Sequence, residues 1–489
     1  MSGNFFSLPT VTFPAVINGH DEPPLPADED DYGQINEKTG GKPVVEVIPP
    51  EFADDALALN FSAAYGDVAR YVDGWGRWFL WDGKVWKHDD TLRVRDVCRR
   101  TCRSYAVNAP PSVQKSVTSA KTIRAVEMLA QADRRHAATV NQWDADPWLL
   151  NTPDGIVDLR TGDTSPHDPS AHMTKITTVS PGGECPMWLA FLDRVTGGDA
   201  SLVAYLQRVC GYALTGITRE HAMWFAYGTG RNGKGVFLNT VVSILGDYAM
   251  TADPDTFTAN GQGKHLTVLA RLQGARLVVA QETEEGVPWA EARIKSITGG
   301  DPITANFMRQ DHFTFIPQFK LFMAGNHKPG LRAVDEAIRA RFNLVPFEVT
   351  IRPEERDPAL SEKLLSEAPG ILAWMMAGCH DWQHVRLTPP PRVRNATDSY
   401  FENEDIFSQW MAECCNTGKE NHSAGSTALY KSWKAWAVAS GEPPISQKRF
   451  SQMLEGKGFK AVKSHGVMEF RGISLPVPTS FHEPDSERF

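Results

Sequence analysis

A short glycine-rich stretch holds the residues of this chain that are best suited to chemistry. It runs from Gly228 to Lys234 with the spacing Gly-x-x-x-x-Gly-Lys, which matches a phosphate-binding loop up to the lysine. In such a loop the backbone N–H groups close around phosphate oxygens, and the lysine ammonium reaches the terminal phosphates. The pattern continues with Ser or Thr, where this chain has Gly235. The stretch therefore predicts a nucleotide-phosphate site with one departure.

The loop needs a strand before it and a helix after it. The apolar run 222–227 predicts a buried strand, and apolar residues recur at helical spacing from Val236 to Leu245. A loop in this position lies at a helix N-terminus, where the helix dipole favours negative charge. We expect the nucleotide to contact Gly228, Thr229, Gly230, Arg231, Asn232, Gly233, Lys234, Gly235 and Val236.

Acidic and amide side chains follow two later strand patterns. The pattern that begins at Arg276 ends in Glu282 and Glu284, and the pattern that begins at Phe319 ends in Asn326. The carboxyl ends of parallel strands meet at one edge of an open α/β sheet, where a nucleotide site forms. A carboxylate there can hold Mg²⁺ and polarise the attacking water. We therefore expect Mg²⁺ beside Glu282.

The stretch between these strands predicts a β-hairpin. Residues 295–317 alternate polar and apolar side chains on both sides of a polar tip from Arg309 to His312. Residues 335–342 then lead into another apolar strand over 343–347.

Charge is distributed unevenly along the 489 residues, a length typical of roughly three domains. The net charge of −9 is carried entirely by the first 60 residues, of which 1–50 read as a disordered acidic tail. Basic patches that bind nucleic acid remain compatible with the rest of the chain. Seven scattered cysteines without a CxxC pair support neither a zinc site nor a disulfide framework, and favour a reducing cytoplasm. No apolar run of 18 residues and no signal peptide is present, so no membrane span is expected.

The segments on either side of the central region predict separate domains. Residues 51–214 read as an α+β domain, with a hairpin turn at Asp82-Gly83 among four tryptophans that favour a packed sheet over base stacking. A helical segment and proline-rich linker is expected over 351–395. Residues 396–489 then read as a winged helix, with a net charge of +5 between 425 and 475. DNA contacts are predicted there at Lys448, Arg449 and Lys463, with a solvated face or a partner site as the alternative.

These motifs in this order resemble the superfamily 3 helicases, and more closely the helicase half of phage and plasmid primase–helicases. The resemblance covers about residues 55–475. The stretches that carry it are Gly228 to Lys234, Arg276 to Glu282, Thr298 to Ala305, Phe319 to Asn326, and Asp335 to Phe347, together with Leu149 to Leu159 and Gln207 to Gly216 upstream. The resemblance implies an α/β fold, a P-loop NTPase core of the AAA+-like superfamily 3 type over 215–350, with the N-terminal α+β domain and the winged helix attached.

The resemblance also implies roles for residues. Lys234 would bind the β- and γ-phosphates of ATP, Glu282 would be the main acid supported by Glu284, and Asn326 would contact the γ-phosphate and position water. Arg341, with Arg339 as the alternative, would act in trans as an arginine finger on a neighbouring subunit. The hairpin would grip single-stranded DNA inside a ring, usually hexameric, through Arg309 and His312, with Lys295 at its base.

The implied function is an ATP-dependent DNA helicase for replication of phage, plasmid or mobile-element DNA, moving 3′→5′ along a single strand in a bacterial cytoplasm. A remodelling ATPase of the same fold and a non-catalytic, ring-forming DNA-binding scaffold are the alternatives. Gly235 departs from the family pattern and predicts weakened or altered Mg²⁺ dependence. No metal-binding carboxylate cluster of a primase precedes the helicase half, so no primase activity is expected, and a separate primase or initiator would be a partner.

Overall fold

A computed structural model describes residues 48–259, 265–281, 287–306, 312–331, 335–418, 422–441, 444–464 and 467–476. The predicted acidic tail, Glu282, Glu284 and Arg309 therefore lie outside the described residues. The chain divides into two compact units, one of residues 1–64 with 94–133 and one of residues 65–93 with 134–489. The predicted domain 51–214 is thus shared between the two units.

The first unit is a small helical body. Its helices are α2 (Asp54–Tyr65), α3 (Arg93–Ala106), α4 (Pro111–Val117) and α5 (Ala120–Ala132). Apolar residues at helical spacing, such as Phe61, Val97 and Val126, are at most 6% exposed, so the helices bury a common core. Arg95 on α3 pairs with Glu127 on α5 at 2.6 Å, which links these two helices.

The second unit begins with a sheet built on tryptophan. Its strand order is β3-β2-β1-β4, from β1 (Ala69–Val72), β2 (Arg77–Trp81), β3 (Trp86–His88) and β4 (Ala137–Ala138). The Asp82 carboxylate accepts two backbone N–H groups and forms the predicted turn between β2 and β3. Trp78 and Trp86 are 6% and 1% exposed, and Trp86 meets Trp143 edge-on with ring centres 5.7 Å apart. The packing role predicted for these two tryptophans is confirmed.

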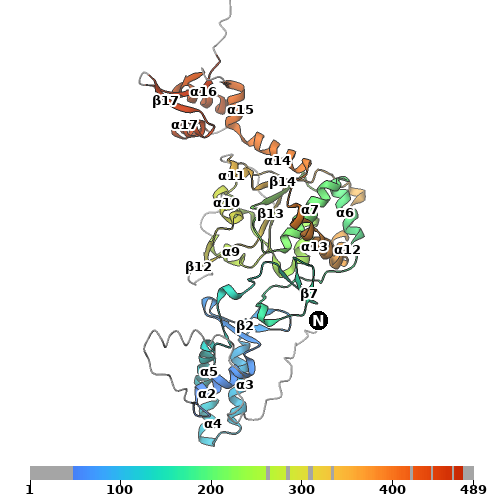
Figure 1. Ribbon diagram of the computed structural model, residues 1–489, viewed down its shortest axis with the longest axis vertical. Helices are drawn as coiled ribbons and strands as arrows, with labels where there is room; N and C mark the ends of the chain where they lie inside the picture. The colour runs from blue at the N-terminus through green and yellow to red at the C-terminus, as the bar shows by residue number, and fades with distance from the viewer. Residues whose placement is uncertain are drawn as a thin grey trace, which may run out of the picture. The chain divides into compact units, whose positions relative to one another are not determined.

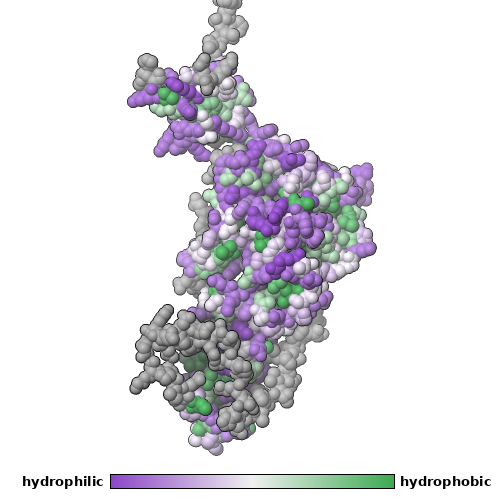
Figure 2. Space-filling view, viewed as in Figure 1, coloured by the Kyte–Doolittle hydropathy of each residue, from purple (hydrophilic) through white to green (hydrophobic). Residues whose placement is uncertain are grey.

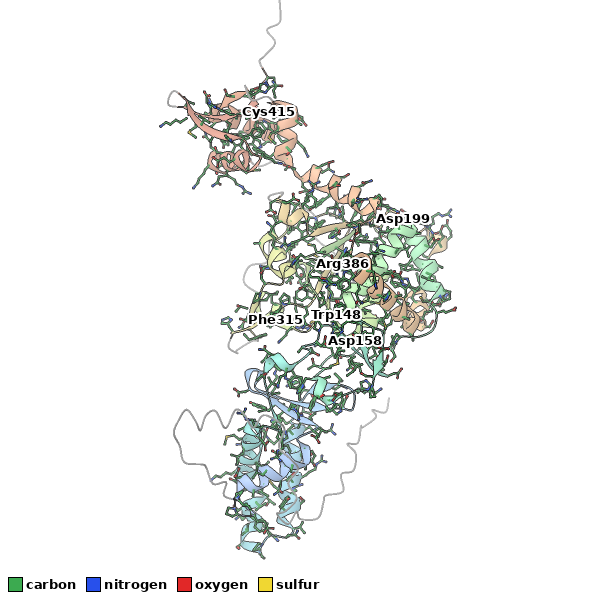
Figure 3. All side chains as sticks on the ribbon, viewed as in Figure 1. Trp148, Asp158, Asp199, Phe315, Arg386 and Cys415 are labelled. Atoms are coloured by element: carbon green, nitrogen blue, oxygen red, sulfur yellow. The ribbon has the colours of Figure 1, made fainter. Side chains whose placement is uncertain are left out.

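A second small sheet follows, in the order β5-β6-β7, from β5 (Leu149–Thr152), β6 (Gly155–Asp158) and β7 (Thr164–Ser165). Two helices then lead to the main sheet, α6 (Pro186–Thr196) and α7 (Ala200–Leu214). Asp199, labelled in Figure 3, caps α7 by accepting the N–H groups of Ser201 and Leu202.

The main sheet has five parallel strands in the order β14-β8-β13-β10-β9. The strands are β8 (Met223–Tyr227), β9 (Ala249–Thr251), β10 (Leu277–Gln281), β13 (Lys320–Gly325) and β14 (Phe342–Pro346). Tyr227 aligns with Gly325 on one neighbour and with Pro346 on the other. The carboxyl ends of the central strands therefore meet at one edge, as the sequence predicts.

Helices cover both faces of this sheet (Figure 1). One face packs α6, α7, α8 (Lys234–Leu245), α12 (Leu360–Ser366) and α13 (Ala368–Val385). The other packs α9 (His265–Arg271), α10 (Glu291–Gly299), α11 (Glu336–Arg339) and α14 (Pro391–Glu404). Alternate residues of β8 enter the two cores, Trp224 on one side and Phe225 on the other. Burial on both faces explains why the strands read as continuous apolar runs, and the mixed α/β fold is confirmed.

The proline run before α14 does not form a linker, which corrects the sequence interpretation. Pro391 is the first residue of α14, a position that proline favours because its missing N–H has no helical partner. Thr397 on α14 accepts the N–H of Leu344 at 2.9 Å, and Tyr400 stacks on Phe342. The segment around residue 396 therefore belongs to the packing of the main sheet rather than to a separate C-terminal domain.

A hairpin and a C-terminal subdomain complete the second unit. The hairpin consists of β11 (Ile303–Asn306) and β12 (His312–Phe315), paired in antiparallel fashion. The subdomain contains α15 (Ile406–Cys414), α16 (Ser426–Ala439), α17 (Gln447–Gly456), β15 (Asn416–Thr417), β16 (Ser423–Gly425), β17 (Lys460–Ser464), β18 (Val467–Arg471) and β19 (Ile473–Ser474). Its core is aromatic, with Trp410, Trp433 and Phe450 at most 4% exposed.

Short 3₁₀ turns connect several elements, at Asp73–Trp75, Val140–Gln142, Pro169–Ala171, Gly246–Tyr248, Pro254–Thr256 and Pro353–Glu355. On the face seen in Figure 2, apolar residues form small separate patches among polar ones. Within the described ranges, every helix is too short or too polar to cross a membrane.

Candidate functional site

The glycine-rich loop lies between the end of β8 and the start of α8, as predicted. Its backbone turns through left-handed conformations, with φ of 95° at Gly230, 53° at Arg231 and 85° at Gly233. Glycine adopts such angles without strain, whereas Arg231 does so against its intrinsic preference. At Gly228 the reason for glycine is contact, because an added Cβ would lie 2.1 Å from both the Asn232 amide nitrogen and the Phe347 carbonyl oxygen.

The Lys234 ammonium points into the loop and is held by neutral oxygens. Its Nζ donates to the Gly228 carbonyl at 2.7 Å, to Asn232 Oδ1 at 3.1 Å and to Asn326 Oδ1 at 3.3 Å. The residue is 7% exposed, and burial lowers the pKa of Lys234 from its ordinary value. Among the described residues, no carboxylate forms an ion pair with it. A buried cation held only by dipoles binds an incoming anion strongly, since little else compensates its charge.

Two asparagines fix the position of that ammonium. Asn232 is 3% exposed, and its Nδ2 donates to the Phe347 carbonyl at 2.7 Å while its Oδ1 accepts from Lys234. Asn326 follows β13 and reaches the same ammonium from the neighbouring strand. The sequence placed both residues at the site, but the clamp between Asn232 and Phe347 was not foreseen.

The Gly235 position opens toward the end of β10. Leaving out the backbone of α8 and the two chain neighbours, a Cβ added to Gly235 would meet one atom of the described residues within 4 Å, Gln281 Oε1 at 3.6 Å. The Gln281 side chain is held by Asn239 of α8, whose Oδ1 accepts from Gln281 Nε2 at 2.9 Å. No motif marks Gln281 or Asn239 in the sequence; the signal that could have found Gln281 is its place just before the predicted acid.

A cavity of about 500 Å³ opens beside the loop. Its lining consists of Tyr227, Gly228, Thr229, Asn326, His327, Lys328 and Glu348. Lys328 Nζ lies 4.1 Å from the centre of the Tyr227 ring, and the Tyr227 hydroxyl donates to Glu348 at 2.8 Å. Burial and the neighbouring Glu348 raise the pKa of Tyr227 to about 12, so the hydroxyl stays protonated at neutral pH. The cavity can accept polar groups of a ligand whose phosphates lie in the loop.

The two candidate finger arginines have different surroundings. Arg339 on α11 forms an ion pair with Asp398 of α14 at 2.8 Å. Arg341, just before β14, donates to the Ala337 carbonyl at 2.7 Å and forms no ion pair with an acid of the described residues. Arg339 therefore has an acidic partner within its own chain, whereas no carboxylate of the described residues forms an ion pair with Arg341.

The predicted DNA contacts lie in two places. His312 is exposed at the start of β12, close in sequence to Arg309, whose structure is not described. Lys295 on α10 pairs with Asp335, the residue that caps α11, so its ammonium already has a partner. Lys448 and Arg449 in the first turn of α17 and Lys463 on β17 are exposed in the C-terminal subdomain. Within the described part of the chain, no three His, Cys, Asp or Glu side chains cluster as a metal site.

Known proteins are similar to this chain in sequence. Residues 58–197 match the family described as D5 N terminal like, and residues 226–341 match a family of unknown function (DUF5906). The "Putative helicase 022R" of Frog virus 3 is 26% identical over 308 residues, which cover 58% of this chain and 30% of that protein. A protein named in the same way from Acanthamoeba polyphaga mimivirus is 23% identical over 295 residues, covering 55% of this chain and 31% of that protein.

The chain thus spans less than a third of the length of the curated relatives it matches. Both relatives come from viruses of eukaryotes, so the bacterial host stays a prediction. The solved structure of the NrS-1 C-terminal region covers 83% of this chain and 95% of its own, with a TM-score of 0.45 and 10% identity. The order of the motifs and these sequence matches support the resemblance to phage-type primase–helicases.

Proposed function

We propose that this chain is an ATP-dependent DNA helicase that acts in replication. The observation that carries the proposal is the buried Lys234 ammonium, held by three neutral oxygens at the N-terminus of α8. A phosphate group supplies the negative charge that this cation lacks, and the loop N–H groups add further donors. The helicase-like relatives support the extension from nucleotide binding to DNA unwinding.

In the proposed reaction, the residues of the loop bind and orient ATP. Lys234 neutralises charge on the β- and γ-phosphates, and Asn326 hydrogen-bonds the γ-phosphate and positions the attacking water. Glu282 stays our predicted acid, with Glu284 in support. The Gln281 side-chain oxygen at the end of β10 and the predicted Glu282 carboxylate are of the kind that Mg²⁺ prefers, and the ion when bound would supply charge neutralisation across the phosphates.

Arg341 completes the site from a neighbouring subunit in this proposal. Its guanidinium has no carboxylate partner among the described residues, whereas Arg339 is paired with Asp398. A finger in trans requires an oligomer, and we propose a ring, hexameric by family resemblance. Such a finger contributes about 10³- to 10⁵-fold in rate, because it stabilises charge in the transition state.

DNA would be held at two places. The hairpin of β11 and β12, with His312 and the predicted Arg309, would grip one strand as the ring moves 3′→5′, a direction taken from the resemblance. The C-terminal subdomain, with its aromatic core and a helix followed by a hairpin, fits the proposed winged helix. Lys448, Arg449 and Lys463 are exposed there and are our proposed phosphate contacts.

The test is ATP turnover with and without single-stranded DNA, together with the mass of the assembly. We expect DNA-stimulated turnover that Lys234→Ala abolishes. Lys363→Ala is the matched control, because Lys363 pairs with Asp357 on the surface and has no contact with the loop. Turnover that survives Lys234→Ala would refute the proposal.

A strand-displacement assay separates unwinding from the alternatives. Turnover without displacement of a paired strand would favour the remodelling ATPase. Assembly on DNA without any Lys234-dependent turnover would favour the non-catalytic scaffold.

A further inference from the structure

We propose that the amide oxygen of Gln281 is a Mg²⁺ ligand that takes over the role of the hydroxyl missing at Gly235. The inference rests on the proposed function, since Mg²⁺ would bind together with the nucleotide. It assigns a metal-binding role to a residue outside the loop and outside the predicted acids.

Gly235 and Gln281 lie at the same edge of the main sheet. Gly235 is the second residue of α8, directly after Lys234. Gln281 is the last residue of β10, which lies two strands from β8, separated from it by β13. The ends of the loop and of β10 thus face the same edge of the sheet.

The Gln281 amide oxygen lies close to the position that a side chain at residue 235 would occupy. Among the described residues, leaving out the backbone of α8 and the two chain neighbours, Gln281 Oε1 is the one atom within 4 Å of a Cβ added to Gly235, at 3.6 Å. Mg²⁺ binds oxygens at about 2.1 Å in an octahedron, so neighbouring ligands lie about 3 Å apart. An oxygen at the Gln281 position can therefore enter the same coordination shell as a serine hydroxyl on residue 235.

A hydrogen bond to Asn239 orients the Gln281 amide. Gln281 Nε2 donates to Asn239 Oδ1 at 2.9 Å, and Asn239 lies one helical turn beyond Gly235 on α8. This hydrogen bond uses the donor end of the amide and turns its acceptor end toward Gly235. Asn239 is thus a positioning residue for the proposed ligand.

A neutral amide is a weaker magnesium ligand than a carboxylate, but its carbonyl oxygen has the same hard character as a serine hydroxyl. A side chain at residue 235 would contact the Gln281 oxygen. Glycine leaves that space open, so the two residues are complementary: one supplies the room and the other supplies the oxygen.

The test measures metal affinity directly. Mn²⁺ is titrated into the full chain saturated with a non-hydrolysable ATP analogue, and free Mn²⁺ is followed by its electron paramagnetic resonance signal. We expect Gln281→Met, which keeps the length of the side chain but removes the oxygen, to weaken Mn²⁺ binding about 10-fold or more. Asn239→Ala should weaken it less, by loss of orientation only.

The decisive variant is the double substitution Gly235→Ser with Gln281→Met. The restored hydroxyl should recover most of the lost Mn²⁺ affinity, which a merely structural role for Gln281 would not produce. Nucleotide affinity in EDTA should stay within about threefold of the parent for the single substitutions Gln281→Met and Asn239→Ala, since neither residue belongs to the phosphate loop.

Two failures are distinguishable. Mn²⁺ affinity that is unchanged in Gln281→Met, while the analogue still binds, overturns this inference and leaves the proposed function standing. A parent chain that binds no nucleotide in EDTA overturns the proposed function and this inference with it.

Discussion

A single methyl group at Gly228 should disable the phosphate loop, whereas the same methyl group at Gly235 should be harmless. Both positions border Lys234 contacts, and both substitutions replace glycine by alanine. The two positions differ in the room available for an added Cβ. At Gly228 the Cβ would lie 2.1 Å from two atoms, whereas at Gly235 the nearest described atom beyond its own helix backbone and chain neighbours is 3.6 Å away.

The magnitude follows from what must move. Carbon–oxygen contacts lie at about 3.3 Å, so the Phe347 carbonyl and the Asn232 amide must each retreat by about 1 Å. The hydrogen bond between them, 2.7 Å in length, cannot survive that shift. Overpacking costs about 1–3 kcal/mol, and an unsatisfied buried carbonyl costs about 1–3 kcal/mol more.

We expect the loss to appear mainly as nucleotide affinity, because Asn232 also orients the Lys234 ammonium. A cost of about 2–6 kcal/mol corresponds to about 30- to 20,000-fold weaker binding. For Gly235→Ala the affinity should stay within about threefold, and the helix should gain up to about 1 kcal/mol because alanine restricts the unfolded chain.

The assay is titration of a fluorescent ATP analogue in EDTA, which removes any effect on the metal. Thermal unfolding of each variant shows whether the fold is retained. Gly228→Ala binding as tightly as the parent would refute the reasoning, and so would equal damage from Gly235→Ala.

Burial lowers the pKa of Lys234, so the ammonium loses its proton as pH rises through that lowered value. Nucleotide affinity should therefore begin to fall at a pH below the range in which an ordinary lysine titrates, and calorimetry should show proton uptake on binding. The Lys234→Arg variant should keep its nucleotide affinity to higher pH, because arginine stays charged. A parent chain whose nucleotide affinity does not change at alkaline pH would contradict the role of Lys234 deprotonation. Arg341→Ala should lower ATP turnover about 10³-fold with nucleotide affinity unchanged, whereas Arg339→Ala should keep turnover and cost under about 1 kcal/mol in stability; the reverse ranking would exchange their roles. Arg276→Met should destabilise the second unit by about 2–4 kcal/mol in urea unfolding, because the 1% exposed guanidinium binds the carbonyls of Leu149 and Leu214 across the sheet edge, and a change under about 0.5 kcal/mol would mean that water replaces it.

Local patterns predicted the loop and its flanking elements well. The apolar run before Gly228 and the helical spacing after Lys234 act over a few residues, so the strand and helix follow from sequence alone. The order of the strands depends on pairings between distant segments, so local patterns did not predict it.

Contacts between distant polar residues could not be predicted. Gln281 and Asn239 are 42 positions apart, and Lys295 and Asp335 are 40 apart, so nothing in the local pattern joins them. Lys295 consequently read as a DNA contact, although the fold gives it an acidic partner. The proline run before α14 misled for a related reason, because a helix start and a linker share the same residue type.

The strand β14 has a further consequence. Arg341 stands at its beginning, and at its end Phe347 and Ile351 hydrogen-bond Asn232 and Arg231 of the loop. Five extended residues span about 17 Å and resist compression because both faces are packed. In the proposed ring, β14 would then connect Arg341, which enters the site of a neighbouring subunit, to the loop that binds the phosphates of the subunit's own nucleotide. A force on Arg341 would then shift the phosphate loop of the same subunit, so ATP hydrolysis at successive sites of the ring would be coupled rather than independent.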